Sequence, residues 1–257
     1  MKIAFEEHGQ GNPVVLLHAF PLSRKMWQPQ IDSLVGANCR VILPDFPGFG
    51  ETPLTSNIST MEALANGIAE LLDSLKIDKA IIGGLSMGGY VTLNLFRLYP
   101  EKFSAMILAD TTSFADTDEK REGRFKLIEA TELKGMKAII EEMLPNLTSD
   151  YTKSNNSQLI KQLEEAFLQT NPKGAIAALR GMAQRSDHTQ ILKSIQIPTL
   201  LIFGEADKVT NLEAAKNLKS NISDAKLVVL EKIGHYSNLE DFERFTQAVV
   251  DFVGEFN

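Results

Sequence analysis

The segment IIGGLSMGGY, residues 81–90, places one serine between two pairs of glycines. The apolar run at 79–85 predicts a buried strand, and residues 87–100 predict a helix. Ser86 therefore falls on the turn between them, within the pattern Gly-x-Ser-x-Gly at 84–88. In a strand–turn–helix context this pattern is typical of a strained turn that exposes a serine hydroxyl above a sheet. The two outer glycines are expected because side chains at those positions would collide across so sharp a turn.

Short apolar runs alternate with helix-period segments along the chain. Most of the runs are nearly continuous in apolar residues, which suits strands buried on both faces of a parallel sheet. The alternation predicts a doubly wound, mostly parallel α/β sheet. The predicted strands are residues 2–7, 13–19, 40–45, 79–85, 104–110, 198–204 and 226–232. The predicted helices are residues 59–75, which open with Ser59 and Glu62 at capping-box spacing, 87–100, 212–221 and 238–256.

The alternation stops between residues 113 and 190. This part contains helical patterns and no strand candidate, and polar stretches such as 148–158 separate its helices. We expect a helical insertion at 113–190, between two strands of a core domain formed by residues 1–112 and 191–257. No internal repeat is visible.

Composition excludes several classes of function. The chain has 257 residues, a net charge of −7 and a single cysteine. The negative charge disfavours nucleic acid and anionic membranes as partners, and one cysteine cannot form an internal disulfide. The N-terminus lacks the apolar segment of a signal peptide, and no apolar stretch approaches 18 residues. We therefore expect a cytoplasmic protein without a membrane partner.

A serine nucleophile needs a base, and the chain offers four histidines. His8 lies in an N-terminal hairpin-like stretch and His188 in a polar segment, and both are expected at the surface. His18 ends a predicted strand. His235 lies in a glycine-containing turn between the last predicted strand and the last helix, where open α/β sheets place functional groups. We therefore expect His235 to be the general base.

The acid that orients the base has three candidates. Asp207 and Glu205 follow the strand at 198–204, and Asp110 ends the strand at 104–110. An acid between the serine and the histidine in chain order is typical of one large class of hydrolases. Asp207 is favoured because it lies far enough around its turn to reach across the site, while the other two remain open. The histidines and the cysteine form no ligand-spaced cluster, so we expect no metal and no cofactor.

The chain resembles the α/β-hydrolase superfamily over nearly its whole length. The matching segments are 14–27, 41–53, 84–91, 197–210 and 233–241, and residues 178–187 look most like the enol-lactonase and small-esterase branch. The resemblance implies a triad of Ser86, Asp207 and His235. It also implies an oxyanion hole formed by the backbone amides of Phe20 and Met87, with His18 bracing the loop before Phe20. By the same resemblance, the insertion at 113–190 is a helical cap over the active site.

The expected activity is hydrolysis of a small carboxylic ester or lactone through an acyl-enzyme on Ser86, with a small molecule as the partner. A mostly apolar pocket under the cap would suit such a substrate. Arg180 and Arg185 could instead bind a substrate carboxylate. The candidate pocket residues are Trp27, Phe114, Met136, Met143 and Met182.

Three alternatives share the same residues. Carbon–carbon bond hydrolysis and a cofactor-free perhydrolase or haloperoxidase activity would use the same triad. A ligand-binding protein that keeps the fold without catalysis is the alternative from another class. Aspartate-nucleophile chemistry is set aside because position 86 is serine.

Overall fold

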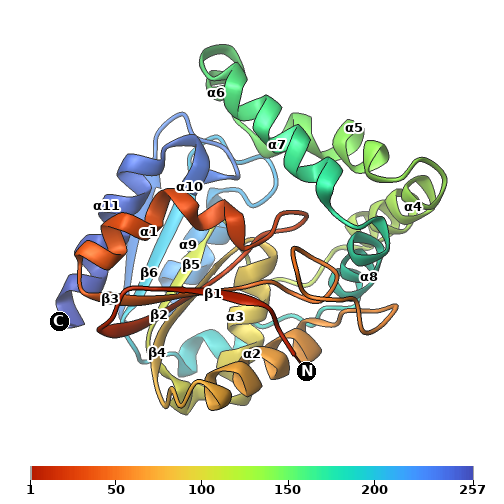
Figure 1. The fold of residues 1–257 in the computed structure, drawn as a ribbon. Helices are drawn as coiled ribbons and strands as arrows, with labels where there is room; N and C mark the ends of the chain where they lie inside the picture. The colour runs from red at the N-terminus through yellow and green to blue at the C-terminus, as the bar shows by residue number, and fades with distance from the viewer. Residues whose placement is uncertain (1, 257) are drawn as a thin grey trace.

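A seven-stranded sheet forms the centre of the molecule in the computed structural model, which describes residues 2–256 (Figure 1). The strand order is β1-β3-β2-β4-β5-β6-β7. Every pairing is parallel except that of β1 with β3, which confirms the mostly parallel α/β sheet. The strands are β1 (Phe5–His8), β2 (Asn12–Leu17), β3 (Cys39–Pro44), β4 (Ala80–Leu85), β5 (Phe103–Ala109), β6 (Thr199–Gly204) and β7 (Ala225–Leu230).

Helices cover both faces of this sheet. The pair α1 (Gln28–Gly36) and α11 (Phe242–Val253) pack together on one face, and α2 (Met61–Ser74) and α3 (Met87–Leu98) pack together on the other (Figure 1). All six residues of β4 are buried, as its position between β2 and β5 requires. Burial on both faces explains why this strand reads as a continuous apolar run.

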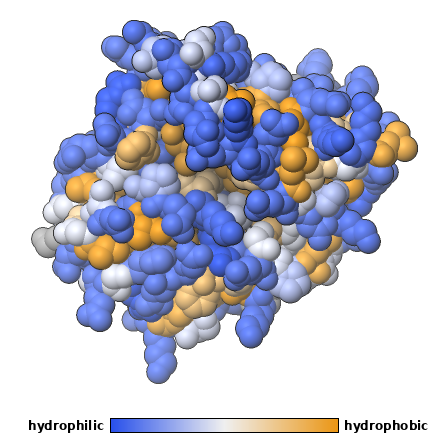
Figure 2. Space-filling model, turned by 45° about the horizontal axis from the view of Figure 1, so that its top comes forward, coloured by the Kyte–Doolittle hydropathy of each residue, from blue (hydrophilic) through white to orange (hydrophobic). Residues whose placement is uncertain are grey.

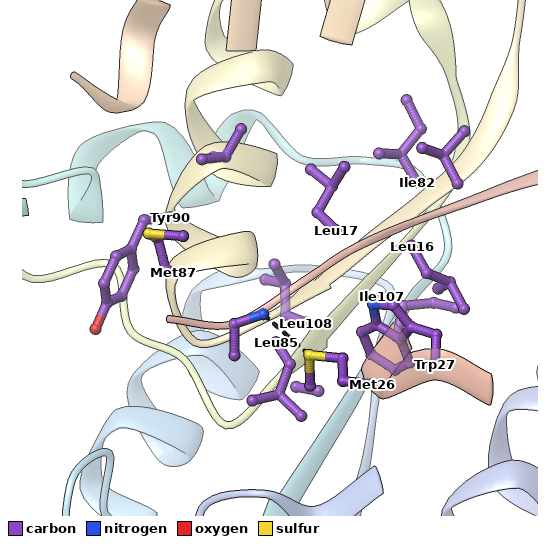
Figure 3. Packing of buried hydrophobic residues seen from close by; sticks show 14 of the residues in the cluster. Leu16, Leu17, Met26, Trp27, Ile82, Leu85, Met87, Tyr90, Ile107 and Leu108 are labelled. Atoms are coloured by element: carbon purple, nitrogen blue, oxygen red, sulfur yellow. Dashed lines mark hydrogen bonds between the residues drawn. The ribbon is translucent and has the colours of Figure 1, made fainter. Parts of the chain in front are cut away.

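Further elements complete the core domain. Helix α9 (Leu212–Asn221) packs on β6 and β7, and the short α10 (Ser237–Glu240) follows the turn after β7. The described residues also form four 3₁₀ helices, of which three connect larger elements and the last follows α11. They are η1 (Arg24–Trp27), η2 (Pro100–Lys102), η3 (Thr189–Ser194) and η4 (Gly254–Phe256). Figure 3 shows Met26 and Trp27 beside the apolar side chains of the sheet.

Five helices lie between β5 and β6 and form the cap, above and to the right of the sheet in Figure 1. They pack mainly on one another, α4 against α5 and α8, and α7 against α5 and α6. This region occupies the predicted insertion at 113–190. The cap helices are α4 (Asp118–Lys134), α5 (Met136–Leu147), α6 (Asp150–Asn155), α7 (Ser157–Gln169) and α8 (Pro172–Ala183).

Several predicted boundaries differ from the structure. Helix α2 is capped by Thr60, whose hydroxyl accepts the Ala63 amide, and not by Ser59. The polar stretch at 148–158 contains α6, because the Ser149 hydroxyl caps that helix. The predicted helix at 238–256 is broken at Asp241, whose side chain caps α11. Helix α1 was not among the predicted elements, and the first strand runs from 5 to 8 rather than from 2 to 7.

The face of the molecule in Figure 2 is largely hydrophilic, with separate apolar patches. Large exposed apolar side chains occur on several elements, among them Phe125, Leu133 and Phe242. Within residues 2–256, no helix combines the length and the hydropathy needed to cross a bilayer.

Two glycines of α8 bring the cap into backbone contact with the core domain. A Cβ at Gly174 would lie 2.1 Å from the carbonyl oxygen of Gly48, and one at Gly181 would lie 1.8 Å from that of Ser59. The two positions are seven residues apart and therefore lie on the same side of the helix. The absence of side chains there lets α8 approach the core loops closely.

Replacement of Gly181 by alanine should therefore destabilise the protein. The new methyl group would meet a backbone oxygen that cannot rotate away, and overpacking of this kind costs about 1–3 kcal/mol. Gly123→Ala is the matched control, because a Cβ at Gly123 in α4 meets nothing within 4 Å. That change should stabilise the protein by about 0.5–1 kcal/mol through helix propensity. Urea unfolding measures both, and equal free energies of unfolding for the two variants would contradict the close contact.

Candidate active site

The turn at Ser86 joins β4 to α3 with a backbone that non-glycine residues rarely adopt. Its φ is 55° and its ψ is −112°. The Ser86 amide donates to the Ala109 carbonyl at 3.0 Å, and the Ser86 carbonyl accepts from the Thr111 hydroxyl at 2.8 Å. Such a conformation costs about 1–3 kcal/mol and persists only when its surroundings hold it. Hydrogen bonds from the end of β5 and the segment after it supply that restraint.

The glycines around Ser86 make room for neighbouring backbone. A Cβ at Gly84 would lie 2.3 Å from the Gly88 carbonyl carbon, which is the predicted collision across the turn. At Gly88 the reason differs, because a Cβ there would lie 2.2 Å from the Leu17 carbonyl oxygen of β2. At Gly89 it would lie 2.3 Å from the Thr111 hydroxyl oxygen. Glycine is therefore required for packing against β2 and the segment after β5 as well as within the turn.

Three side chains predicted from the sequence form a hydrogen-bonded chain. The His235 Nε2 lies 2.8 Å from the Ser86 Oγ, and the His235 Nδ1 lies 2.8 Å from the Asp207 Oδ2. With Asp207 ionised, Nδ1 carries the proton and Nε2 accepts from the serine hydroxyl. His235 is 1% exposed and Ser86 is 8% exposed, so the chain is shielded from bulk water while the hydroxyl keeps some access. This arrangement can take a proton from Ser86.

Asp207 is held by the residues that follow it. Its Oδ1 accepts the amides of Val209 at 2.7 Å and Thr210 at 3.0 Å, and its Oδ2 accepts the Thr210 hydroxyl at 2.5 Å. The sequence analysis missed Thr210. An acidic side chain that bonds amides two and three residues ahead is a common local motif, so the spacing of Asp207 and Thr210 could have indicated it.

Opposing effects determine the charge state of this chain. Burial lowers the pKa of His235, but the charge and hydrogen bond of Asp207, together with Asp110 and Glu240, outweigh burial, so the net pKa lies above the ordinary 6.5. Burial likewise raises the pKa of Asp207, and the charge and hydrogen bond of His235 reverse this, so its net pKa is lowered. Asp207 is therefore the ionised partner that stabilises an imidazolium.

The other two acid candidates bond elsewhere. The Asp110 carboxylate accepts the Gly204 amide at 2.8 Å and bonds the Ser237 hydroxyl. Burial first, and the nearby Asp207 second, raise the pKa of Asp110 well above its usual range. The Glu205 carboxylate accepts the Lys232 amide at 3.1 Å. Of the three acids, Asp207 is the one bonded to the His235 ring.

The remaining histidines have separate environments. The His18 Nε2 accepts the Phe46 amide at 3.0 Å, so its Nδ1 carries the proton and donates to the Ala19 carbonyl at 3.0 Å. Burial lowers the pKa of His18 to about 4, which keeps it neutral. His8 is half-buried near Glu6. The surface prediction for His188 is wrong, because this side chain is only 6% exposed.

The two amides expected to form an oxyanion hole belong to two separate segments of the chain. Met87 is the first residue of α3, so its N–H is one of the helix-terminal donors without an intrahelical acceptor. Phe20 lies in the loop after β2, and its ring packs edge-to-face on Phe49 at 6.2 Å between ring centroids. Figure 3 shows Met87 and Tyr90 on α3 beside the sheet.

The expected pocket residues have mixed positions. Trp27 belongs to the core, because it is 1% exposed and its ring lies 6.0 Å from that of Phe245. Phe114 is 37% exposed at the surface. Met136 and Met182 are buried in the cap, and Met143 is partly buried there. Phe114 also lines a cavity of about 230 Å³ together with Thr112 and Thr210, and all five residues stay predicted pocket residues.

A cavity of about 310 Å³ lies between α7 and residues 22–26. Its walls combine apolar Leu22 and Leu163 with the charged Arg24 and Glu51. The lining does not include Ser86, so this cavity alone does not define where an acyl group would bind.

Both arginines considered for a substrate carboxylate are engaged with the protein. Arg185 is buried, lies 2.6 Å from the Asp116 carboxylate and stacks 4.3 Å from the centre of the Tyr90 ring. Arg180 lies 3.1 Å from Glu132 on the cap surface. Among the described residues, no group of three or more acidic, histidine or cysteine side chains is arranged to hold a metal ion.

Comparisons with known proteins agree with this architecture. The sequence model of a family described as alpha/beta hydrolase fold matches residues 12–242. A solved structure of a thermophilic esterase from Thermogutta terrifontis, with malate bound, is 37% identical and superposes with a TM-score of 0.95 over 98% of this chain and 93% of that chain. The 3-oxoadipate enol-lactonase 1 of Acinetobacter baylyi is 29% identical over 93% of this chain and 88% of its own length. A 2-hydroxy-6-oxo-6-phenylhexa-2,4-dienoate hydrolase of Comamonas testosteroni is 28% identical over 98% of this chain and 91% of its own length.

The imidazole of His235 should titrate above 6.5, and Asp207→Asn should lower its pKa. The substitution removes the largest opposing charge, so burial dominates and disfavours the imidazolium. Ring-proton chemical shifts followed by NMR across pH measure this directly. Asp150→Asn, on the cap surface, is the control and should leave the titration unchanged. A His235 pKa that rises in Asp207→Asn would contradict the assigned pairing.

Proposed function

Because the chain belongs to the α/β-hydrolase fold family, we propose that it is a serine hydrolase that cleaves a small carboxylic ester or lactone through an acyl-enzyme on Ser86. The observation that carries the proposal is the hydrogen-bonded chain from the Ser86 Oγ through His235 to Asp207, with both links at 2.8 Å. A serine hydroxyl is weakly nucleophilic at neutral pH, and an adjacent oriented base is what activates it.

In the first half of the reaction, the Ser86 Oγ attacks the substrate carbonyl carbon while the His235 Nε2 takes the hydroxyl proton. The carbonyl oxygen becomes an oxyanion, which the amides of Phe20 and Met87 would stabilise. The position of Met87 at the N-terminus of α3 adds the favourable end of the helix dipole. His235 then donates its proton to the leaving alcohol oxygen as the ester bond breaks.

In the second half, His235 takes a proton from water, and the resulting hydroxide attacks the acyl-enzyme carbonyl. Collapse of the second tetrahedral intermediate releases the carboxylic acid, and the proton returns to the Ser86 Oγ. Asp207 stays ionised throughout and stabilises the imidazolium in both halves. The chemistry derived from these residues uses no metal.

Two relatives support the substrate class. The Thermogutta terrifontis relative is named an esterase, and the Acinetobacter baylyi relative is named an enol-lactonase. Attack of serine on an ester and on a lactone is the same step, and the two differ in whether the leaving group stays attached. Carbon–carbon bond hydrolysis is the alternative on the same triad, and the Comamonas testosteroni relative is named as a hydrolase of a different compound, 2-hydroxy-6-oxo-6-phenylhexa-2,4-dienoate.

A neutral acyl group fits the surrounding charges better than an anionic one. The guanidinium of Arg185 is already paired with Asp116 and donates to the Phe114 carbonyl at 3.2 Å. The ionised Asp207 carboxylate is a buried negative charge 2.8 Å from the His235 Nδ1. A second buried charge without a partner would cost free energy on binding.

Mutation of Ser86 to alanine should abolish ester hydrolysis. We expect kcat to fall by about 10⁶-fold for p-nitrophenyl esters, because the nucleophile is lost while the binding surface remains. Assays across acyl lengths from two to twelve carbons would also measure the size of the acyl site. Ser74→Ala at the C-terminal end of α2 is the matched control and should keep wild-type turnover. An active Ser86→Ala variant would overturn the proposal, and a wild type inactive on every ester would favour carbon–carbon hydrolysis.

Neutral esters should be better substrates than anionic ones of similar length. We expect kcat/KM for p-nitrophenyl butyrate to exceed that for the p-nitrophenyl monoester of succinate by about tenfold or more. A tenfold difference corresponds to about 1.4 kcal/mol, and burying one unpaired charge costs more than this. Arg180→Gln is the control and should leave the ratio unchanged. A preference for the succinate ester that Arg185→Gln removes would instead assign Arg185 to substrate binding.

A further inference from the structure

Tyr236 connects the loop of the base to the loop before the oxyanion site. It directly follows His235 and is fully buried. Its hydroxyl donates to the Phe20 carbonyl at 2.8 Å, across 216 positions of the chain. The two loops therefore meet through one hydrogen bond between a side chain and a backbone carbonyl.

The backbone of Phe20 is held on both of its peptide units. On one side, the Ala19 carbonyl accepts from the His18 Nδ1 at 3.0 Å and from the Leu22 amide at 2.9 Å. In a trans peptide the N–H points opposite to the carbonyl, so these bonds set the direction of the Phe20 N–H. On the other side, the Phe20 carbonyl is held by Tyr236. A rotation of Phe20 would have to break a bond on either side.

Tyr236 is itself tightly fixed. Its amide donates to the Glu240 Oε1 at 3.2 Å, and the Glu240 Oε2 accepts the Gly234 amide at 3.1 Å, so Glu240 holds the backbone on both sides of His235. The Tyr236 ring lies 6.4 Å from that of Phe167 in the cap, in edge-to-face contact. Burial, and next the nearby Glu240, raise the pKa of Tyr236 well above its usual range, so the hydroxyl remains a donor.

Glu240 also extends this contact to the cap. Its Oε2 accepts the Ser149 amide at 2.9 Å and the Thr152 hydroxyl at 2.6 Å, both at the start of α6. The Thr170 hydroxyl, just after α7, donates to the Pro21 carbonyl at 2.7 Å. The cap thus forms hydrogen bonds that reach both the loop of Phe20 and the loop of His235.

We propose that Tyr236 is a positioning residue. Its hydroxyl fixes the position of the Phe20 N–H relative to the His235 imidazole, so that both act on the same substrate carbonyl. The inference rests on the proposed serine hydrolase function. The oxyanion forms only in the transition state, and a donor displaced by about 1 Å can cost about a hundredfold in rate. Loss of this relative position should therefore reduce kcat more than it changes KM.

Tyr236→Phe tests this directly, because it removes the hydroxyl and keeps the buried ring. We expect kcat on p-nitrophenyl acetate to fall by about 10- to 100-fold, with KM changed by less than about threefold. The acid limb of the kcat/KM profile should keep its midpoint, because that limb reports His235. Tyr99→Phe is the matched control. It also removes one hydroxyl bond, to the Asn66 Oδ1 at 3.0 Å, and should leave kcat unchanged.

Unchanged kcat in Tyr236→Phe, in an enzyme that hydrolyses the ester, would overturn the positioning role while the proposed function stands. A shifted acid limb with an unchanged plateau would also overturn it, since the effect would then be on the base. Amide hydrogen exchange of residues 18–26, followed by mass spectrometry, is independent of any substrate. It should be faster in Tyr236→Phe than in the wild type and Tyr99→Phe. If the wild type hydrolyses no ester, the proposed function fails, and unaltered exchange would overturn the restraint itself.

Discussion

The backbone of Ser86 can hold its left-handed conformation only while the neighbouring strands crowd around it. Its amide is bonded to the end of β5, its carbonyl to Thr111 just beyond, and the first turn of α3 rests on the Leu17 carbonyl of β2. A hydroxyl on a relaxed turn would have no fixed direction. The nucleophile, the free amide of Met87 and the start of α3 are therefore all aligned by the packing of the sheet beneath them, and the rest of the site is arranged around that alignment.

Three carboxyl groups surround the buried imidazole, and their environments separate their roles. Asp207 bonds the ring, and its pKa is lowered by the partner that it orients, although burial acts in the opposite direction. The pKa of Asp110 is raised by burial and by Asp207, and its oxygens accept hydrogen bonds from the Gly204 amide and the Ser237 hydroxyl. Glu240 binds backbone amides of the His235 loop and the cap. The buried charge of Asp207 beside the base is thus stabilised. Asp110 and Glu240 instead stabilise the backbone segments around His235.

The cap is attached to the core domain at points that bear on the site. Helix α8 lies on the core loops through Gly174 and Gly181, where no side chain separates the backbones. Glu240 links the start of α6 to the His235 loop, and Thr170 links the end of α7 to Pro21. The insertion at 113–190 could have been joined to the sheet through its two ends alone. Instead it shares hydrogen bonds with both loops next to Ser86, so the position of the cap and the geometry of those loops are not independent.

The sequence by itself determined the seven strands, the helical insertion, the turn at Ser86 and the choice of His235, because apolar periodicity and glycine spacing are local properties. It placed the strand ends and caps less well, as at Ser59 and in the break at Asp241, since several nearby polar residues can each cap a helix. Only the tertiary structure decided which of three acids faces the imidazole, that His188 is buried, and that Tyr236 reaches Phe20. Those contacts join residues 28 to 216 positions apart or depend on elements packed from elsewhere. A short-range pattern carries no information about which distant backbone a side chain will meet.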